Sequence, residues 1–408
     1  MAYPSRQILV RKILSCFVLV YYSENFEAGS ALTLLKKLRF VFLAAALSCL
    51  SSVAFAAPKV ILDTDMAYLN DDALAMFVLT QADNAGMLDL IGVTTVGGNV
   101  FVPEATTATL RQLELIGRHD IPVYQGTDEP LAGFRNMREE ARLYGMPIFC
   151  GAYWDFSHDD FTDLSKRSRH YLKLNTEPPY GYPETRAKEL PAWDFIIESV
   201  KENPGEVTIM AVGAATNIAT ALRKYPALAE EAAGIIYMGG DIDVPGNATA
   251  AAEVNWFYDP DAIKLCLSAN WKKQIIVPDD LSRQIRLTQA FYDRLAKNNN
   301  NSITKLILSG SKTFTIDEAQ YVWDVLVPVI FLKPEIITDL QERYITVDER
   351  PGLNSGRAVS WSQQSNNDIK TGKGFPEGVR KADIVMGIDA PAFWDFYIHM
   401  LTFKSMVY

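Results

Sequence analysis

Four acidic residues near the start of the first apolar region could do chemistry together. Asp63 and Asp65 end a short apolar run that begins at Lys59, and the pair Asp71-Asp72 opens the next apolar segment. Carboxylates this close repel one another, so they are tolerated together only if a cation lies among them or some remain protonated. Every ligand atom is an oxygen, and no Cys or His lies nearby. This favours a hard cation, Ca²⁺ or Mg²⁺, over Zn²⁺.

The alternative for these acids is a solvated loop followed by a helix N-terminus, where the helix dipole favours Asp. That alternative accounts for Asp71 and Asp72 but leaves Asp63 and Asp65 at a strand end without a reason. The sequence therefore predicts a metal site.

A second group of polar residues lies between Gly246 and Pro260. Asn247, Glu253 and Asn255 could project into one cleft and offer amide and carboxylate groups to a ligand. Such a set suits a polyhydroxylated ligand, because each hydroxyl both donates and accepts hydrogen bonds. Loop and turn chemistry explains the same residues, since Asn and Gly form turns and Asp-Pro is typical of a helix start. The residues alone leave both interpretations open.

The elements that would position these residues alternate between strands and helices. From residue 58, short β-rich runs are followed by longer amphipathic stretches, which predicts an α/β fold with an open, mostly parallel central sheet and flanking helices. Ligands of such sheets bind outside the carboxyl ends of the strands. We expect strands at 59–62, 90–96, 207–212, 235–238 and 274–277, and helices at 72–81, 103–116, 192–201, 215–224 and 260–268.

Residues 58–408 are expected to form one domain. The whole chain of 408 residues is 49% hydrophobic and 22% charged, which is typical of a globular protein of this size. Residues 127–190 are rich in aromatic residues, Pro, Arg and Asp, which predicts a long insertion or lid beside the site. Residues 349–380 are typical of a polar hairpin and loop.

The N-terminal region carries the features of a signal peptide. Residues 40–57 are apolar, three basic residues precede them, and Ala54-Phe55-Ala56 closes the stretch. This pattern predicts cleavage near residue 56 or 57 and an exported, periplasmic protein. An uncleaved membrane anchor is the alternative, because the stretch is near the minimum spanning length. Residues 1–35 fit no signal architecture, and we expect the true start near residues 32–35.

The net charge indicates which classes of partner are disfavoured, and the cysteine content bears on disulfide bonds. Residues 1–57 hold six Lys or Arg and two Asp or Glu, so the remainder carries a net charge of −14 against −10 for the whole chain. This disfavours nucleic acids and anionic membranes as partners. Only Cys150 and Cys266 remain after cleavage, and we expect both to be unpaired.

Taken in order, these motifs resemble the inosine–uridine-preferring nucleoside hydrolase family. The run from Asp63-Thr-Asp65-Met to Asp71-Asp72-Ala-Leu-Ala is similar to the family's N-terminal signature, and the resemblance extends to about residue 402. The later matching segments are 95–99, 213–219, 238–240, 247–255, Asp259-Pro260, Trp323-Asp324 and Pro334. The resemblance implies a Rossmann-like fold, a ribonucleoside as small-molecule substrate and a homo-oligomer, a dimer or tetramer.

The resemblance also implies a role for each matching residue. Asp71 matches the general base that takes a proton from a water bound to the metal, and Asp63 would orient the ligands from behind them. The Ca²⁺ ligands would be the carboxylates of Asp65, Asp72 and Asp324 and the backbone carbonyl of Thr216. The residues that hold the ribose hydroxyls would be Asn99, Asn247, Glu253 and Asn255.

Two features depart from the family's pattern. The loop 66–70 is longer than in the commoner signature Asp-x-Asp-Pro-Gly-x-Asp-Asp. The sequence therefore leaves open the path of this loop and the direction in which the Asp71 side chain points. Trp323 stands where the family often has a His that protonates the leaving base, and an indole cannot act as an acid near neutral pH.

The aromatic insertion offers candidates for the base side of the site. His158 is the one histidine that we consider for protonation of the base, and a plain exposed loop histidine is the alternative. Trp154, Phe156 and Trp323 could stack on the base, and hydrophobic packing of a long loop explains the first two equally well.

We therefore predict an N-ribosyl hydrolase that cleaves ribonucleosides to ribose and free base in a Ca²⁺-dependent reaction. The alternative is a Ca²⁺-dependent nucleoside- or ribose-binding protein without turnover, which Trp323 and the longer loop suggest. A phosphohydrolase of the haloacid-dehalogenase kind is suggested by Asp63-Thr-Asp65 after a strand, but it leaves the group 247–255 without a role.

Overall fold

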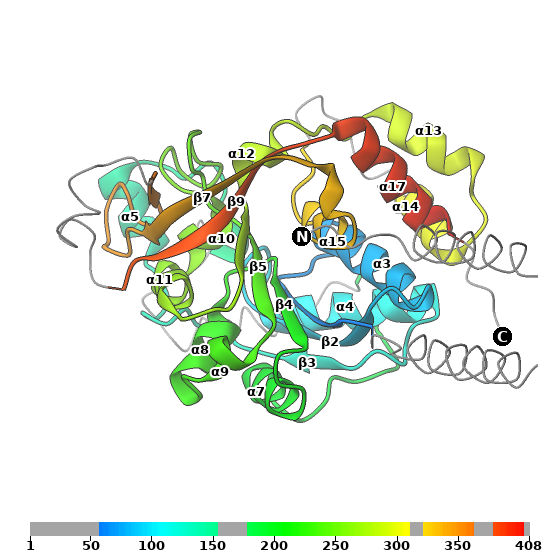
Figure 1. Ribbon diagram of the computed structural model, residues 1–408, viewed down its shortest axis with the longest axis horizontal. Helices are drawn as coiled ribbons and strands as arrows, with labels where there is room; N and C mark the ends of the chain where they lie inside the picture. Colours follow the sequence, from blue (N-terminus) through cyan, green and yellow to red (C-terminus); the bar gives the residue numbers. More distant parts are fainter. Residues whose placement is uncertain (1–56, 154–177, 311–320, 363–377, 404–408) are drawn as a thin grey trace, which may run out of the picture. The chain divides into compact units, whose positions relative to one another are not determined.

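A nine-stranded sheet crosses the part of the chain that the computed structural model describes, residues 57–153, 178–310, 321–362 and 378–403 (Figure 1). Its strand order is β3-β2-β1-β4-β5-β6-β9-β7-β8. The strands are β1 (Lys59–Thr64), β2 (Asp89–Thr95), β3 (Val123–Gln125), β4 (Val207–Ala211), β5 (Gly234–Met238), β6 (Gln274–Val277), β7 (Ile337–Val347), β8 (Ala358–Trp361) and β9 (Arg380–Ile388). In this order, the strands from β3 through β9 pair in parallel with their neighbours. Strand β7 pairs antiparallel with β9 on one side and with β8 on the other. The predicted open, mostly parallel α/β sheet is confirmed.

Strand β1 marks the point where the strand order reverses. It lies between β2 and β4 and pairs in parallel with both, so that Asp63 is in register with Thr94 on one side and Ala211 on the other. The chain leaves β1 and β4 toward opposite sides of the sheet, which opens a crevice outside their carboxyl ends. The predicted acidic residues lie at this crevice.

Two hydrophobic cores cover the two faces of the sheet. In β1, Val60 and Leu62 belong to one core and Ile61 to the other, as the alternation of side chains along a strand requires. The first core packs against α3 (Asp71–Asn84), α4 (Val102–Ile116), α13 (Gln289–Lys297), α14 (Ser302–Gly310), α15 (Leu326–Leu332) and α17 (Ala390–Thr402). The second packs against α7 (Ala192–Glu202), α8 (Thr216–Lys224), α9 (Leu228–Glu231) and α11 (Pro260–Ser268) (Figure 1). Burial on both faces explains why the central strands are continuous apolar runs.

All predicted strands and helices are present, with ends that differ by a few residues. Strand β1 continues to Thr64, so Asp63 lies within the strand, whereas the sequence predicts that it follows the strand. The elements without a prediction include β3, which is short, and β7, whose residues are mostly exposed or half-buried and lack an apolar run. The unpredicted helices near the site are α5 (Met137–Tyr144), α10 (Val254–Tyr258) and α12 (Asp279–Ser282).

The described part of segment 127–190 reaches the polar loops at the sheet's edge. The amide of Ala152, in the 3₁₀ turn η1 (Gly151–Tyr153), donates to Gly98 O at 2.8 Å, and the amide of Ile148 donates to Ala248 O at 2.7 Å. These bonds place the segment next to the loops that carry Asn99 and Asn247. Trp154, Phe156 and His158 lie outside the described residues, as does the predicted signal segment.

Cys150 and Cys266 are both buried and both free thiols, as expected. Within the described residues, no helix is long and apolar enough to cross a lipid bilayer.

Candidate active site

The loop between β1 and α3 has a path that neighbouring side chains fix. Asn70 caps α3, because its Oδ1 accepts from the amide of Ala73 at 3.3 Å. Leu69 has a φ of 54°, in the left-handed region, and its amide donates to Gln112 Oε1 of α4 at 2.7 Å. The longer loop is therefore held against α4, and it delivers Asp71 and Asp72 to the end of β1.

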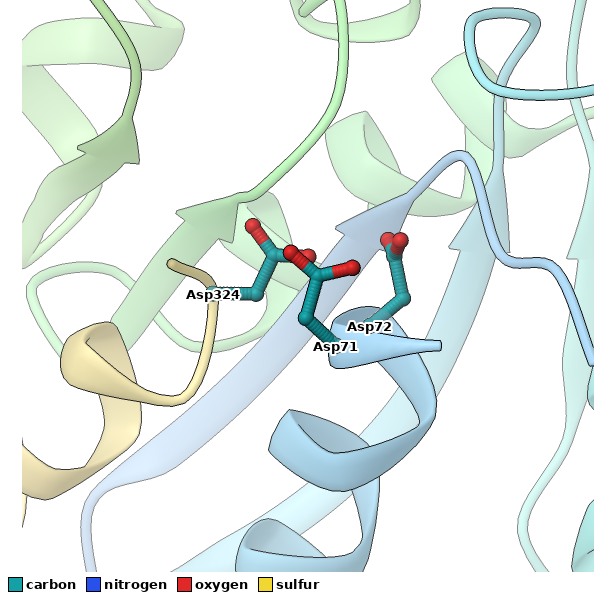
Figure 2. A group of neighbouring side chains, drawn as sticks. All are labelled: Asp71, Asp72 and Asp324. Atoms are coloured by element: carbon teal, nitrogen blue, oxygen red, sulfur yellow. The ribbon is translucent and has the colours of Figure 1, made fainter. Parts of the chain in front are cut away.

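Three carboxylates from two distant parts of the chain point toward one another (Figure 2). Asp71 and Asp72 come from the first turn of α3, and Asp324 comes from the segment just before α15. Their carboxylate oxygens lie within 4.8 Å of one another. Asp72 and Asp324 are buried and Asp71 is half-buried. Such a group could hold a metal ion.

Donors from the adjoining loops orient the acids. Asp72 accepts from the Thr64 hydroxyl through Oδ1, and through Oδ2 from Asn70 Nδ2 at 2.6 Å and Asn99 Nδ2 at 3.2 Å. The backbone N–H of Asn99 also donates to Asp65 Oδ2 at 2.6 Å. Asn99 thus contacts two of the predicted metal ligands, in addition to the ribose role that the sequence suggests.

Asp63 lies one layer behind this group. Its Oδ1 accepts from Thr94 Oγ1 at 2.6 Å and from Asn217 Nδ2 at 2.7 Å. Among the described residues, Asp63 Oδ2 and Asp65 Oδ1 are buried and accept no hydrogen bond. A buried carboxylate oxygen without a donor is unfavourable unless a cation or a proton compensates it.

The electrostatics of the group fit a bound cation. Burial, and then the charge of Asp72, raises the pKa of Asp71 to about 7. Burial and the neighbouring carboxylates also raise the pKa values of Asp65 and Asp324 well above the ordinary range. A divalent cation would offset both causes, and the all-oxygen donor set suits a hard ion such as Ca²⁺.

A cavity of about 370 Å³ opens beside the carboxylates. Its walls include seven residues singled out from the sequence: Asp71, Asn99, Asn247, Glu253, Asn255, Trp323 and Asp324. Four further lining residues are Phe149, Val212, Met238 and Val254. These four are apolar, so nothing in their residue type separates them from ordinary core residues.

The polar residues across the cavity have fixed hydrogen-bonding directions. Glu253 is fully buried and caps α10: its Oε1 accepts from the Asn255 amide at 2.9 Å, and its Oε2 accepts from the Gly240 amide at 3.0 Å. Burial raises the pKa of Glu253 to about 7. Asn255 Nδ2 donates to Val212 O at 3.0 Å, whereas Asn247 Oδ1 accepts from the Val254 amide at 2.9 Å. Asn255 therefore keeps an acceptor for a ligand, and Asn247 keeps a donor.

Thr216 is the one predicted metal ligand that the structure does not bring to this group. It begins α8, and its carbonyl accepts from Thr220 Oγ1 at 2.8 Å within that helix. Its hydroxyl donates to Asp259 Oδ2 at 2.7 Å. Val212, which directly follows β4, lines the cavity in its place. The difference arises because the backbone turns into α8 at Thr216, so its carbonyl lies along the helix.

The comparison with known proteins shows the family and the fold. Residues 60–395 match the model of the family described as inosine-uridine preferring nucleoside hydrolase. The chain belongs to this family. Its solved nucleoside hydrolase neighbours include a plant enzyme, with 27% identity, a TM-score of 0.66 and coverage of 85% of this chain and 100% of that one. An inosine-guanosine nucleoside hydrolase aligns with 23% identity, a TM-score of 0.67 and coverage of 85% and 99%, and supports the fold.

Curated relatives of this nucleoside hydrolase family member align over different lengths. The probable uridine nucleosidase 2 of Arabidopsis thaliana is 33% identical over 238 residues, which are 58% of this chain and 64% of that protein. The non-specific ribonucleoside hydrolase RihC of Salmonella newport is 28% identical over 335 residues, 82% of this chain and 94% of that protein. The chain thus spans slightly less than two thirds of the Arabidopsis relative.

Trp323 forms the boundary between two cavities of this nucleoside hydrolase fold. It is half-buried, and its Nε1 donates to Asp279 Oδ1 at 2.6 Å. Trp323 and Asp71 line the first cavity and also a second, largely apolar one of about 290 Å³ that includes Phe291 and Tyr397. The sequence singles out Trp323 but not Asp279, because the two residues are far apart in the chain.

Asp241 is a buried acid close to the carboxylates of Glu253 and Asp279. Asp241 follows β5, is 4% exposed, and accepts no hydrogen bond through either oxygen from the described residues. Burial, and then the charges of Glu253 and Asp279, raises its pKa to about 9. Asp241 therefore keeps its proton at neutral pH.

This proton makes stability depend on pH. The folded chain holds it up to about pH 9, whereas an aspartate in an unfolded chain loses it near pH 4, so stability falls as the pH rises between these values. Asn has no such proton to lose. We expect the melting temperature of Asp241→Asn, relative to the unsubstituted protein, to rise by about 2 °C or more between about pH 6 and about pH 8.5. Thermal unfolding at both pH values checks this, and an equal difference at both would contradict it.

Proposed function

We propose that this protein hydrolyses the N-glycosidic bond of ribonucleosides to ribose and free base, with Ca²⁺ as cofactor and Asp71 as general base. The observation that carries the proposal is the 370 Å³ cavity, in which the carboxylates of Asp71 and Asp324 share one chamber with Asn247, Glu253 and Asn255. Family membership supports the reaction class.

The metal would be held by Asp65, Asp72 and Asp324. When bound, the cation would lower the pKa of an attacking water and make it a better nucleophile. Asp71 would accept the proton of the attacking water. Without metal the pKa of Asp71 is about 7, and a cation bound by the neighbouring carboxylates would lower it, so that Asp71 is deprotonated and can act as a base at neutral pH. Its carboxylate lies on the cavity wall.

The opposite wall suits the sugar. Ribose hydroxyls both donate and accept, and Asn247 and Asn255 offer one donor and one acceptor in fixed orientations. Positive charge develops on the sugar ring when the glycosidic bond breaks, and the Glu253 and Asp carboxylates around the cavity would stabilise it.

The base would occupy the aromatic part of the cavity. The aromatic side chains of Phe149 and Trp323 line the cavity there, and Val254 adds apolar surface. The described lining contains no histidine, so His158 stays a prediction as the group that protonates the base. Names of relatives direct attention to uridine and inosine as first substrates.

Base release by purified residues 58–408 tests the proposal. A panel of purine and pyrimidine ribonucleosides would be incubated with Ca²⁺ and, in parallel, with a chelator. Release that requires Ca²⁺ would support the hydrolase and name its base. Calcium-dependent ribonucleoside binding without any release would favour the alternative of a binding protein.

The basic and apolar segment before residue 57 suggests export, and we infer that the protein acts in the periplasm. The family resemblance suggests that it acts as a homo-oligomer. N-terminal sequencing of the protein from a periplasmic extract tests the export. A start near residue 57 is expected, and retention in the membrane with residues 40–57 intact would contradict it.

Gly98 provides a test of the geometry around Asp65. A Cβ atom at Gly98 would overlap the Asp65 carboxylate, so Gly98→Ala must displace a predicted metal ligand. Displacement of about 1 Å at such a site reduces activity by about 100-fold, and we expect a loss of this order in kcat/KM for the variant. The control is Gly86→Ala, where a Cβ meets no atom within 4 Å, so that its φ of 66° strains the backbone without displacing a residue of the site. An equal loss in both variants would show a general effect of alanine.

A further inference from the structure

A buried carboxylate holds the indole of Trp323. Asp279, the first residue of α12, is 1% exposed. Its Oδ1 accepts from Trp323 Nε1 at 2.6 Å, and its Oδ2 accepts from Arg283 Nε at 2.7 Å. A charge-assisted bond is stronger than one between neutral groups, and the ion pair with Arg283 offsets the burial of the charge.

The same turn of chain also ties down the loop that leads to the sugar side of the cavity. The Asp279 amide donates to Gly240 O at 3.0 Å, and Arg283 Nη2 donates to Pro245 O at 2.6 Å. The Asp280 carboxylate accepts from the amides of Ile242 and Asp243, at 2.8 Å each. The start of α12 is therefore anchored to loop 241–245, which runs directly into Asn247.

This anchoring fixes the position of Asp279 relative to the aromatic wall of the cavity, which is the part lined by Phe149 and Trp323. The Trp323 indole packs against the first hydrophobic core on one side and lines the cavity on the other, and the strong bond at Nε1 fixes the orientation of its ring plane. Tyr321 packs edge-on against the Trp323 ring, with centroids 5.8 Å apart, which does not replace a bond to the indole nitrogen. Asp279 alone among the described residues accepts this proton.

We propose that Asp279 is a positioning residue for base recognition: it holds the Trp323 indole in the orientation against which a purine or pyrimidine ring stacks. This inference rests on the proposed function. It assigns a role in substrate specificity to a residue that does not itself line the cavity.

Three substitutions separate the role of Asp279 from a general structural one. Asp279→Leu removes the acceptor at similar size, Asp279→Asn keeps an acceptor oxygen, and Trp323→Phe keeps an aromatic ring without the N–H. We expect Asp279→Leu to raise KM for ribonucleosides about tenfold, which is the effect of losing a hydrogen bond to a charged group. Asp279→Asn should recover most of this loss. Inhibition by free ribose should weaken far less than KM rises, because ribose does not use the aromatic wall and meets Asp279 only indirectly, through Arg283 and loop 241–245.

The double variant Asp279→Leu/Trp323→Phe decides whether Asp279 acts through Trp323. If it does, the double variant loses no more in KM than the worse single variant, whereas independent roles multiply. Asp243→Asn is the matched control, since Asp243 is a carboxylate of the adjoining loop, at the surface, that pairs with Arg343. Multiplied losses, or an equal weakening of ribose inhibition, would overturn the proposal.

A measurement without turnover keeps this test separate from the proposed function. In protein with ¹⁵N-labelled tryptophan, the Trp323 indole resonance is the one missing from Trp323→Phe. We expect Asp279→Leu to move this resonance and to speed its hydrogen exchange, with no change in Asp243→Asn. If the unsubstituted protein releases no base, the proposed function fails, and this resonance still reports on Asp279. An unmoved resonance in Asp279→Leu would overturn the inference.

Discussion

Asp71→Asn is expected to slow base release by about 10²–10⁴-fold, which is the usual contribution of a positioned general base. The substitution keeps the size of the side chain and its place on the cavity wall, and it removes only the ability to accept a proton. Ribonucleoside binding should therefore persist. Single-turnover release at saturating Ca²⁺ measures the chemical step, and Asp89→Asn, at an exposed carboxylate, is the control.

The pH profile gives a second reading of the same substitution. Burial and the charge of Asp72 raise the pKa of Asp71 to about 7, and a cation held by the neighbouring carboxylates would lower it again. A base works only when deprotonated, so kcat/KM should fall on the acid side, at a pH below 7 when Ca²⁺ is saturating. Asp71→Asn should remove this acid limb. A variant that keeps both the rate and the limb would assign the base to another group.

Some parts of the site are predictable from the sequence because local patterns encode them. Buried parallel strands are continuous apolar runs, so the end of β1 could be placed within a few residues. Asp65 and Asp72 stand out because acids follow such a run directly. Asp324 lies far along the chain, and only the order of motifs, taken as a family resemblance, connects it with Asp72.

Other parts depend on contacts that leave no local pattern. Asp279 meets Trp323 only after α12 and the segment before α15 have packed, and neither segment carries a sign of the other. Phe149 and Val212 line the cavity with apolar side chains that are like those of the core. For Thr216, residue type and spacing predict a ligand, but the direction of its carbonyl is set by where α8 begins.

Removal of Ca²⁺ by a chelator is expected to abolish base release and to lower the melting temperature, more at about pH 8 than at about pH 5.5. The sign follows from the raised pKa values of Asp65, Asp71 and Asp324. Without metal, the folded state keeps protons that the unfolded chain loses above about pH 4, so its stability falls as the pH rises. A bound cation takes the place of those protons, and its stabilising effect therefore grows with pH.

The size of this effect follows from mass action. Calcium at 100 times its dissociation constant would stabilise the folded state by about 2.7 kcal/mol.

Asp324→Asn removes one carboxylate of the three that meet in Figure 2, and we expect it to raise the Ca²⁺ concentration for half-maximal activity by at least about 100-fold. Asp324 lies next to Trp323, so Trp323→Phe is the matched control and should leave the calcium requirement unchanged. Full activity in chelator would contradict the role of these carboxylates, because four buried or half-buried acids would then remain together without a cation to explain them.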